Sequence, residues 1–289
     1  MTPTIDFRSF AESYVLAHPQ TNLYLLIDHA GLPGLYRELV RNQIEWENLF
    51  DESRESGAKA VAPFLIFMAN ISTLGARNAF INWVSKTGLL TSSIVVLASP
   101  QPISEMKKRL VARLDVQLSG DMDAMLRFYD PRILEQLSKV LSSRQGNAFF
   151  CVAERWWFVS RTGQLSEIES SFKIVDEPGS QLLLNQNQES ALIEAVEPDR
   201  VLYLLLETVP HLVPRLPPNR YMFVKNNVAK ASTYNISSTL DYVLYCTAAL
   251  LYGENFDVQP HWSNTLADVR TGTITLAQAV ANSPEIEYE

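Results

Sequence analysis

Short apolar runs alternate with segments of helical periodicity through the first part of the chain. Five of these runs have the length of buried strands and lie at residues 23–28, 61–68, 94–98, 124–129 and 148–153. Between them, residues 102–114 and 131–141 place apolar side chains on one helical face. Because the strands do not alternate with polar residues, burial on both sheet faces is expected. We therefore predict an α/β lobe whose mixed or mostly parallel sheet is flanked by helices.

The pattern changes after the fifth run. Residues 156–160 and 172–175 are expected to form a hairpin, and from about residue 186 only helical spacing follows. Pro198 suits the first position of a helix that ends at Thr208. Ser238 predicts the N-cap of a helix over 239–252, with Leu240 on its inner face and Gly253 as its stop. The chain is therefore expected to form two lobes, an α/β lobe over 1–180 and an all-helical lobe over 181–289.

Composition narrows the function classes. The net charge of −8 disfavours binding to nucleic acid, because phosphate backbones are held by clustered Lys and Arg. No run reaches the roughly 18 apolar residues of a membrane span, and the N-terminus lacks the apolar core of a signal peptide. We therefore expect a cytoplasmic protein that binds neither nucleic acid nor membrane. Cys151 and Cys246 lie in apolar runs and are expected to be buried thiols.

Known catalytic and metal-binding patterns are missing from the sequence. The four histidines and two cysteines show no metal-ligand spacing, and no nucleophile elbow or glycine-rich phosphate loop is present. We predict no catalytic residue, no cofactor and no metal. One enzymatic alternative stays open: Asp28 and His29 end a predicted strand, where α/β proteins place chemistry. With Asp130 they would form the site of a hydrolase or transferase.

The run Arg127-Phe-Tyr-Asp-Pro-Arg132 combines a chain turn with three charges. Asp130 stands directly before Pro131, which predicts an N-cap followed by proline at the first helical position. Arg127 and Arg132 could pair with Asp130 at the surface. The run is then either a charged active-site corner or the start of a helix. The absence of a neighbouring nucleophile favours the helix start.

Two other segments suggest surface contacts. Lys107, Lys108, Arg109 and Arg113 follow helical spacing and predict a solvated basic face, with contact to an acidic partner as the alternative. Arg155, Trp156 and Trp157 fall in a predicted strand, where adjacent side chains point to opposite faces. One tryptophan is therefore a candidate for partner binding, and packing of both rings in the core is the alternative.

The order of several short motifs resembles a known family. The motifs are a Tyr24-to-Asp28 strand, Leu49-Phe50, Ala62-Pro63-Phe64-Leu65 and the Arg127-to-Arg132 run. This set resembles the DUF4123-type adaptor and chaperone proteins of bacterial type VI secretion systems over residues 23–159. Residues 240–256 are also similar to their helical tail. The signature residues are Tyr24, Asp28, Pro63, Arg127, Phe128, Tyr129, Asp130, Pro131 and Arg132.

The resemblance implies a function. Such proteins bind a toxic effector in the cytoplasm and help load it onto the VgrG spike protein. They are not enzymes, and the signature residues are expected to determine the fold. The resemblance places effector specificity in the helical lobe. An immunity or scaffold protein of the same gene cluster is the alternative, with the hydrolase as a third.

Overall fold

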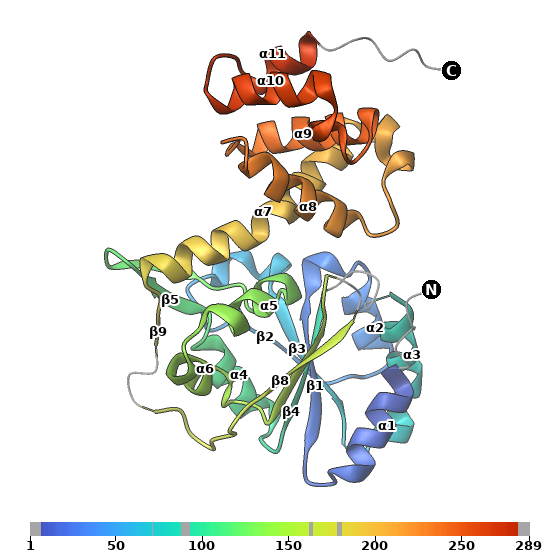
Figure 1. Cartoon of the computed structure of the whole chain (residues 1–289). Coiled ribbons are helices and arrows are strands. Elements are labelled where there is room, and N and C mark those ends of the chain that lie inside the picture. The colour runs from blue at the N-terminus through green and yellow to red at the C-terminus, as the bar shows by residue number, and fades with distance from the viewer. Residues whose placement is uncertain (1–6, 71, 88–92, 162–163, 178–180, 283–289) are drawn as a thin grey trace. The chain divides into compact units, whose positions relative to one another are not determined.

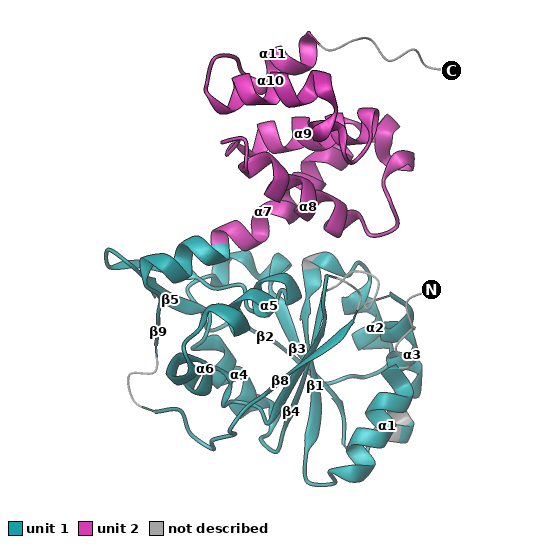
Figure 2. Cartoon of the chain, in the orientation of Figure 1, with its two compact units in different colours: residues 1–192 teal, residues 193–289 magenta. Residues whose placement is uncertain are grey.

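The chain folds into two compact units. The computed structural model describes residues 7–70, 72–87, 93–161, 164–177 and 181–282. The units comprise residues Met1–Leu192 and Ile193–Glu289 (Figure 2). The division lies after the predicted boundary at residue 180 because the following segment contacts the first unit. There the Leu184 N–H donates to the Gln117 carbonyl, and Gln188 Nε2 donates to the Val140 carbonyl.

A six-stranded sheet forms the centre of the first unit, in the order β2-β3-β1-β4-β7-β8. Every adjacent pair in it is antiparallel, so the predicted mixed or mostly parallel sheet is wrong. The strands are β1 (Asn22–Asp28), β2 (Trp46–Asn48), β3 (Pro63–Ala69), β4 (Ile94–Ser99), β7 (Arg155–Val159) and β8 (Leu165–Glu169).

Helices cover both faces of this sheet, and this explains the error. On one side lie α1 (Phe7–Ala17), α2 (Leu35–Arg41) and α3 (Asn78–Thr87), and on the other lie α4 (Ile103–Val111), α5 (Pro131–Val140) and α6 (Ser143–Phe150), as Figure 1 shows. All six residues of β4 are consequently buried. Burial on both faces produces apolar runs whatever the strand direction, so the runs predicted burial correctly but could not report direction.

A second, three-stranded sheet has the order β6-β5-β9. Its strands are β5 (Asp115–Leu118), β6 (Met122–Met125) and β9 (Leu182–Leu183). The strand predicted over 124–129 is therefore wrong beyond residue 125, where the chain turns into α5. The strand predicted over 148–153 is wrong as well. Ser142 and Gln145 form a reciprocal capping box that starts α6 through this segment.

The connections of the first unit include 3-10 segments. They lie at His29–Gly31, Ser56–Val61 and Leu74–Arg77. The expected hairpin is formed by β7 and β8. Residues 172–175, predicted as its second strand, are not in a strand. No helix among the described residues is long and apolar enough to cross a membrane.

The second unit is helical throughout its described residues. Its helices are α7 (Gln186–Thr208), which begins in the first unit, α8 (Arg220–Ser232), α9 (Thr239–Tyr252), α10 (Pro260–Arg270) and α11 (Leu276–Ala281). Short 3-10 segments lie at Pro210–Arg215 and Phe256–Val258. A separate apolar core includes Tyr245, Phe256 and Trp262.

Two details of the helical prediction change. Ser238 caps α9 as predicted, since its hydroxyl accepts from the Asp241 N–H. Leu240, however, is 72% exposed, because α9 turns Tyr242, Tyr245 and Cys246 into the core instead. Pro198 lies inside α7 rather than at its start.

Candidate functional site

The signature residues meet at one corner of the first unit. Arg127 Nη2 lies 3.1 Å from Asp28 Oδ2 and 4.0 Å from Asp130 Oδ2. Arg132 Nη2 lies 2.7 Å from the same Asp130 oxygen. These four residues, here called the corner network, join the end of β1 to the start of α5. The two aspartates are buried, while both arginine side chains are about half exposed.

Asp130 is the N-cap of α5, as predicted. Its Oδ1 accepts hydrogen bonds from the backbone N–H of Arg132 and from Arg132 Nε, both at 2.9 Å. Pro131 occupies the first helical position. The fixed φ of proline and the missing N–H suit that place. The sequence Asp-Pro-Arg thus builds the helix start and positions an arginine over its own cap.

The other motifs of the resemblance converge on the same corner. Asp28 pairs with Pro63 across β1 and β3, and the Pro63 carbonyl accepts from the Leu49 N–H at 3.1 Å. The rings of Phe50 and Tyr129 lie 6.4 Å apart between centroids. Motifs separated by up to a hundred residues therefore form one continuous structure. Tyr24 lies further along β1, where its hydroxyl donates to the Gln101 carbonyl at 2.5 Å.

The corner also bears on the hydrolase alternative. The structure brings Asp28 and Asp130 together, since both approach Arg127. His29 follows Asp28, and its ring stacks on Phe64 with centroids 4.5 Å apart. Its Nδ1 is buried without a hydrogen-bond partner among the described residues. The arrangement is an ion-pair network in which each carboxylate is engaged by a guanidinium.

Both tryptophans of the predicted contact segment are buried, so their assignment to partner binding is not supported by exposure. Trp156 packs against Phe149 and Phe150 at the α6 side of the sheet. Trp157 packs against Phe10 and Tyr14 of α1. The two rings do point to opposite faces, but helices cover both.

Arg155 completes the predicted contact segment. It is partly exposed and forms ion pairs with Glu167 and Glu169 of the neighbouring strand. Of the three residues, only Arg155 therefore reaches the surface.

The basic face predicted on α4 is also largely buried. Lys107, Arg109 and Arg113 are each at most 8% exposed. Lys107 pairs with Glu47 and Glu52, with Nζ–Oε distances of 2.9 and 3.2 Å. Only Lys108 lies at the surface, where it pairs with Glu105. The prediction of a solvated face is therefore wrong for three of the four residues.

Arg109 and Arg113 converge on one carboxylate, Asp176. Both guanidinium groups donate to Asp176 Oδ1, and Arg113 Nη1 also donates to Oδ2 at 2.8 Å. Cys151 Sγ lies 3.6 Å from Asp176 Oδ1. Arg109, Arg113 and Asp176, here called the buried cluster, anchor the segment after β8 to α4 and to the turn that follows it. The spacing of the arginines by one helical turn was the only sequence signal for it.

In the buried cluster, burial and the neighbouring arginines shift the pKa of Asp176 in opposite directions. Burial raises the pKa of Asp176, but hydrogen bonds from Arg113 and Arg109 outweigh it and hold that pKa well below the usual range. Burial likewise raises the pKa of the Cys151 thiol. In Cys246 of the second unit, burial raises the pKa to about 12. Both cysteines are free and buried, as predicted.

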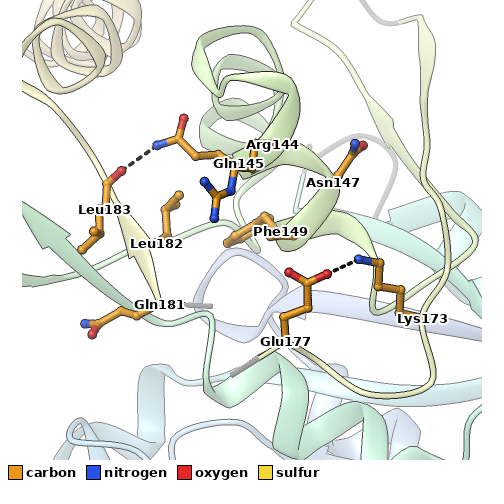
Figure 3. A pocket seen from close by; sticks show the side chains of 10 residues that line it. Arg144, Gln145, Asn147, Phe149, Lys173, Glu177, Gln181, Leu182 and Leu183 are labelled. Atoms are coloured by element: carbon orange, nitrogen blue, oxygen red, sulfur yellow. Dashed lines mark hydrogen bonds and ion pairs between the residues drawn. The ribbon is translucent and has the colours of Figure 1, made fainter. Parts of the chain in front are cut away.

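A groove of about 760 Å³ lies next to the buried cluster, between α6 and β9. Phe149 and Leu182 supply apolar lining, while Arg144 and Asn147 are exposed at its side (Figure 3). Gln145 Nε2 donates to the Leu183 carbonyl across the groove. Its volume falls within the range of ligand pockets, about 300–1,000 Å³. Among the described residues no group of three or more His, Cys, Asp or Glu side chains is arranged to hold a metal ion.

The corner network lies in a segment that matches a known protein family. Residues 23–148 match the family described as "Domain of unknown function (DUF4123)". This confirms the expected DUF4123 resemblance over these residues. No curated protein and no solved structure matches the chain.

The DUF4123 match contains the whole corner network but only part of the buried cluster. All four residues of the corner network lie inside the matched segment. The buried cluster takes Arg109 and Arg113 from inside it and Asp176 from beyond its end. The segment from Arg155 to Trp157 lies outside the match.

Proposed function

We propose that this chain is a non-enzymatic adaptor that binds an effector protein of a bacterial type VI secretion system. In the cytoplasm it would help to load that effector onto the VgrG spike protein. The observation that carries the proposal is the convergence of the motifs of the resemblance. Asp28, Pro63 and the Arg127-to-Arg132 run contribute to one corner through cross-strand pairing, ion pairs and a helix cap.

The corner supports an adaptor because its polar groups are engaged in building the fold. Asp130 is 5% exposed and accepts from three nitrogen atoms of Arg132. Asp28 is paired with Arg127. Signature residues of this kind specify how β1 and α5 meet. A binding function then depends on surfaces elsewhere in the chain.

The second unit offers apolar side chains for contact with a protein. Tyr203, Leu240 and Val258 are each at least 60% exposed. Single exposed apolar residues are ordinary on a protein surface, so their role must be tested. We expect effector contacts to include Leu240, which α9 presents to solvent.

Co-purification tests the proposal directly. The full chain is co-expressed with the effector and the VgrG protein encoded beside it, and capture of each is measured. We expect a stable complex with the effector, and loss of its secretion when the adaptor gene is deleted. No complex together with unimpaired secretion would refute the proposal.

Matched variants locate the contact. Leu240→Glu is expected to reduce effector capture at least about tenfold, because it buries a charge at an apolar contact. Leu16→Glu changes an equally typical exposed leucine, 65% exposed on α1, and should leave capture unchanged. If both variants bind normally, the contact surface does not include Leu240. If the chain alone protects cells from the toxin, it is an immunity protein instead.

A further inference from the structure

Strand β8 forms one edge of the six-stranded sheet, and among the described strands it has a neighbour only on its β7 side. None of its five residues is fully buried, and Leu165, Glu167 and Glu169 are exposed. In Figure 1 β8 is the yellow-green strand. Edge strands present unpaired backbone donors and acceptors, which are a template for another strand.

The hydrogen-bond register identifies which backbone groups are free. The Ser160 N–H donates to the Gln164 carbonyl, and the Ser170 N–H donates to the Glu154 carbonyl. Both bonds belong to the β7–β8 register, in which Trp157 lies opposite Glu167. Bonded and non-bonded pairs alternate along an antiparallel ladder. The backbone N–H and C=O groups of the even-numbered residues of β8 therefore point toward β7. Those of the odd-numbered residues point away from it.

The outward-facing residues are Leu165, Glu167 and Glu169. Their backbone N–H and C=O groups point away from β7 and form no hydrogen bond among the described residues. Three consecutive outward positions are enough to bind a segment of about five residues, since outward groups recur at every second residue. The edge is thus free and regular over its whole length.

The side chains at these positions set the charge of a partner. Glu167 and Glu169 both pair with Arg155, and Trp157 Nε1 donates to Glu167 at 2.9 Å. Two carboxylates share one guanidinium, which leaves one negative charge in excess. Glu169 is 77% exposed at its side chain. A cationic side chain opposite Glu169 or Glu167 would complete this arrangement.

The same charges disfavour a second copy of this chain. Antiparallel pairing of β8 with itself, centred on Glu167, places the two Glu167 side chains directly opposite each other. A shift by one pair toward Glu169 places Glu167 opposite Glu169, and the opposite shift pairs only residues 165–167 of the two copies. Like charges in directly opposite positions destabilise a strand pair. The occupant that fits is a strand from a different protein.

We propose that β8 binds an extended, basic segment of a partner protein as a seventh, antiparallel strand. Its residues opposite Glu169 and Glu167 are Lys or Arg, and the residue between them packs against Ile168. A polar residue then faces Ser166, and an apolar residue faces Leu165. The recognised pattern is basic, apolar, basic, polar, apolar. This binding mode, strand addition to a sheet edge, rests on β8 alone and does not depend on the adaptor role.

Labelled synthetic peptides test the proposal on the full chain. The probe contains Lys-Val-Lys-Thr-Val between threonines, and its binding is followed by fluorescence anisotropy. A peptide with Glu in place of both lysines is expected to bind at least about fivefold more weakly. Methylation of the two lysine backbone nitrogens, which donate toward β8, should abolish binding. Methylation of the central Val and the Thr, whose N–H groups point away, should not.

Two further measurements use the protein itself. Glu169→Lys should weaken binding of the lysine peptide about fivefold or more, whereas Glu105→Lys, a charge reversal on α4, should not. Peptide binding should slow hydrogen exchange at the amides of Glu167 and Glu169. Lack of binding by the lysine peptide, equal binding of the two methylated peptides, or pairing of β8 between two copies in solution would overturn the proposal.

Discussion

The corner network and the buried cluster use the same chemistry in different surroundings. In both, aspartate oxygens accept hydrogen bonds from two arginines. The arginine side chains of the corner network are 49% and 47% exposed. Those of the buried cluster are 8% and 7% exposed. The motif that stands out in the sequence therefore holds the more solvated ions, and the motif that does not stand out holds the buried ones.

This difference sets how much each cluster contributes to stability. Water and salt screen the exposed pairs, whose contribution is typically about 0–1 kcal/mol. Removal of one partner from a buried pair leaves an uncompensated charge and costs about 3–5 kcal/mol. The buried cluster also has a mechanical role, because Asp176 fixes a segment without regular structure to α4. The comparison leads to three predictions, from the largest effect to the smallest.

Asp176→Ala is expected to destabilise the first unit by about 3–5 kcal/mol, because two buried guanidiniums lose their carboxylate. Urea unfolding followed by tryptophan fluorescence measures the change. Glu177→Ala is the matched control, since Glu177 pairs with Lys173 at the surface and should alter the unfolding midpoint little. Equal effects of the two substitutions would show that burial does not set the contribution of Asp176.

Lowering the pH should remove the contribution of Asp176 to the free energy of unfolding. Its pKa in the folded state is held below the value of about 3.9 expected in the unfolded chain. The stabilisation is therefore present above about pH 5 and is lost as pH falls below about 4 toward the folded-state pKa. The difference in unfolding free energy between the natural protein and Asp176→Ala should narrow over that range. A difference that stays constant down to pH 3 would contradict this assignment.

Substitutions in the corner network should lower the free energy of unfolding less than Asp176→Ala does. Asp130→Ala is expected to cost about 0.5–2 kcal/mol, mainly through loss of the α5 cap. Arg127→Ala removes only a half-exposed partner and should cost about 0–1 kcal/mol. Thermal unfolding of both variants gives the comparison. If Arg127→Ala is the more damaging change, the link between Asp28 and α5 outweighs the helix cap.

Local chemistry was predictable from the sequence, and long-range partners were not. Asp130 and Pro131 indicated the cap of α5 because the interaction lies within two residues. The ion pair between Asp28 and Arg127 joins residues far apart in the chain, so no local pattern could reveal it. Similarly, the spacing of Arg109 and Arg113 indicated a shared helical face. Nothing near them indicated that Asp176 would cover that face.

The sheet illustrates the same limit. Alternation along a strand correctly placed Trp156 and Trp157 on opposite faces. Their exposure was not predictable, because α1, from the start of the chain, covers the second face. The apolar runs identified β1, β3 and β4, but the strand order depends on pairing between distant segments. Helical spacing was predicted from about residue 186, but one continuous α7 was not, because Pro198 resembled a helix start.

The strand order has a consequence for synthesis of the protein. Once β1 and β4 have been made they can pair, but the other edge of β4 stays open until β7 emerges. Residues 100–154 must be translated first, which takes roughly 3–11 s at about 5–20 residues per second. Throughout that interval the nascent chain carries an open strand edge along the sequence Ile-Val-Val-Leu-Ala-Ser. We therefore expect this ribosome-bound stage to be prone to edge-to-edge aggregation, and slower translation between β4 and β7 to lengthen it.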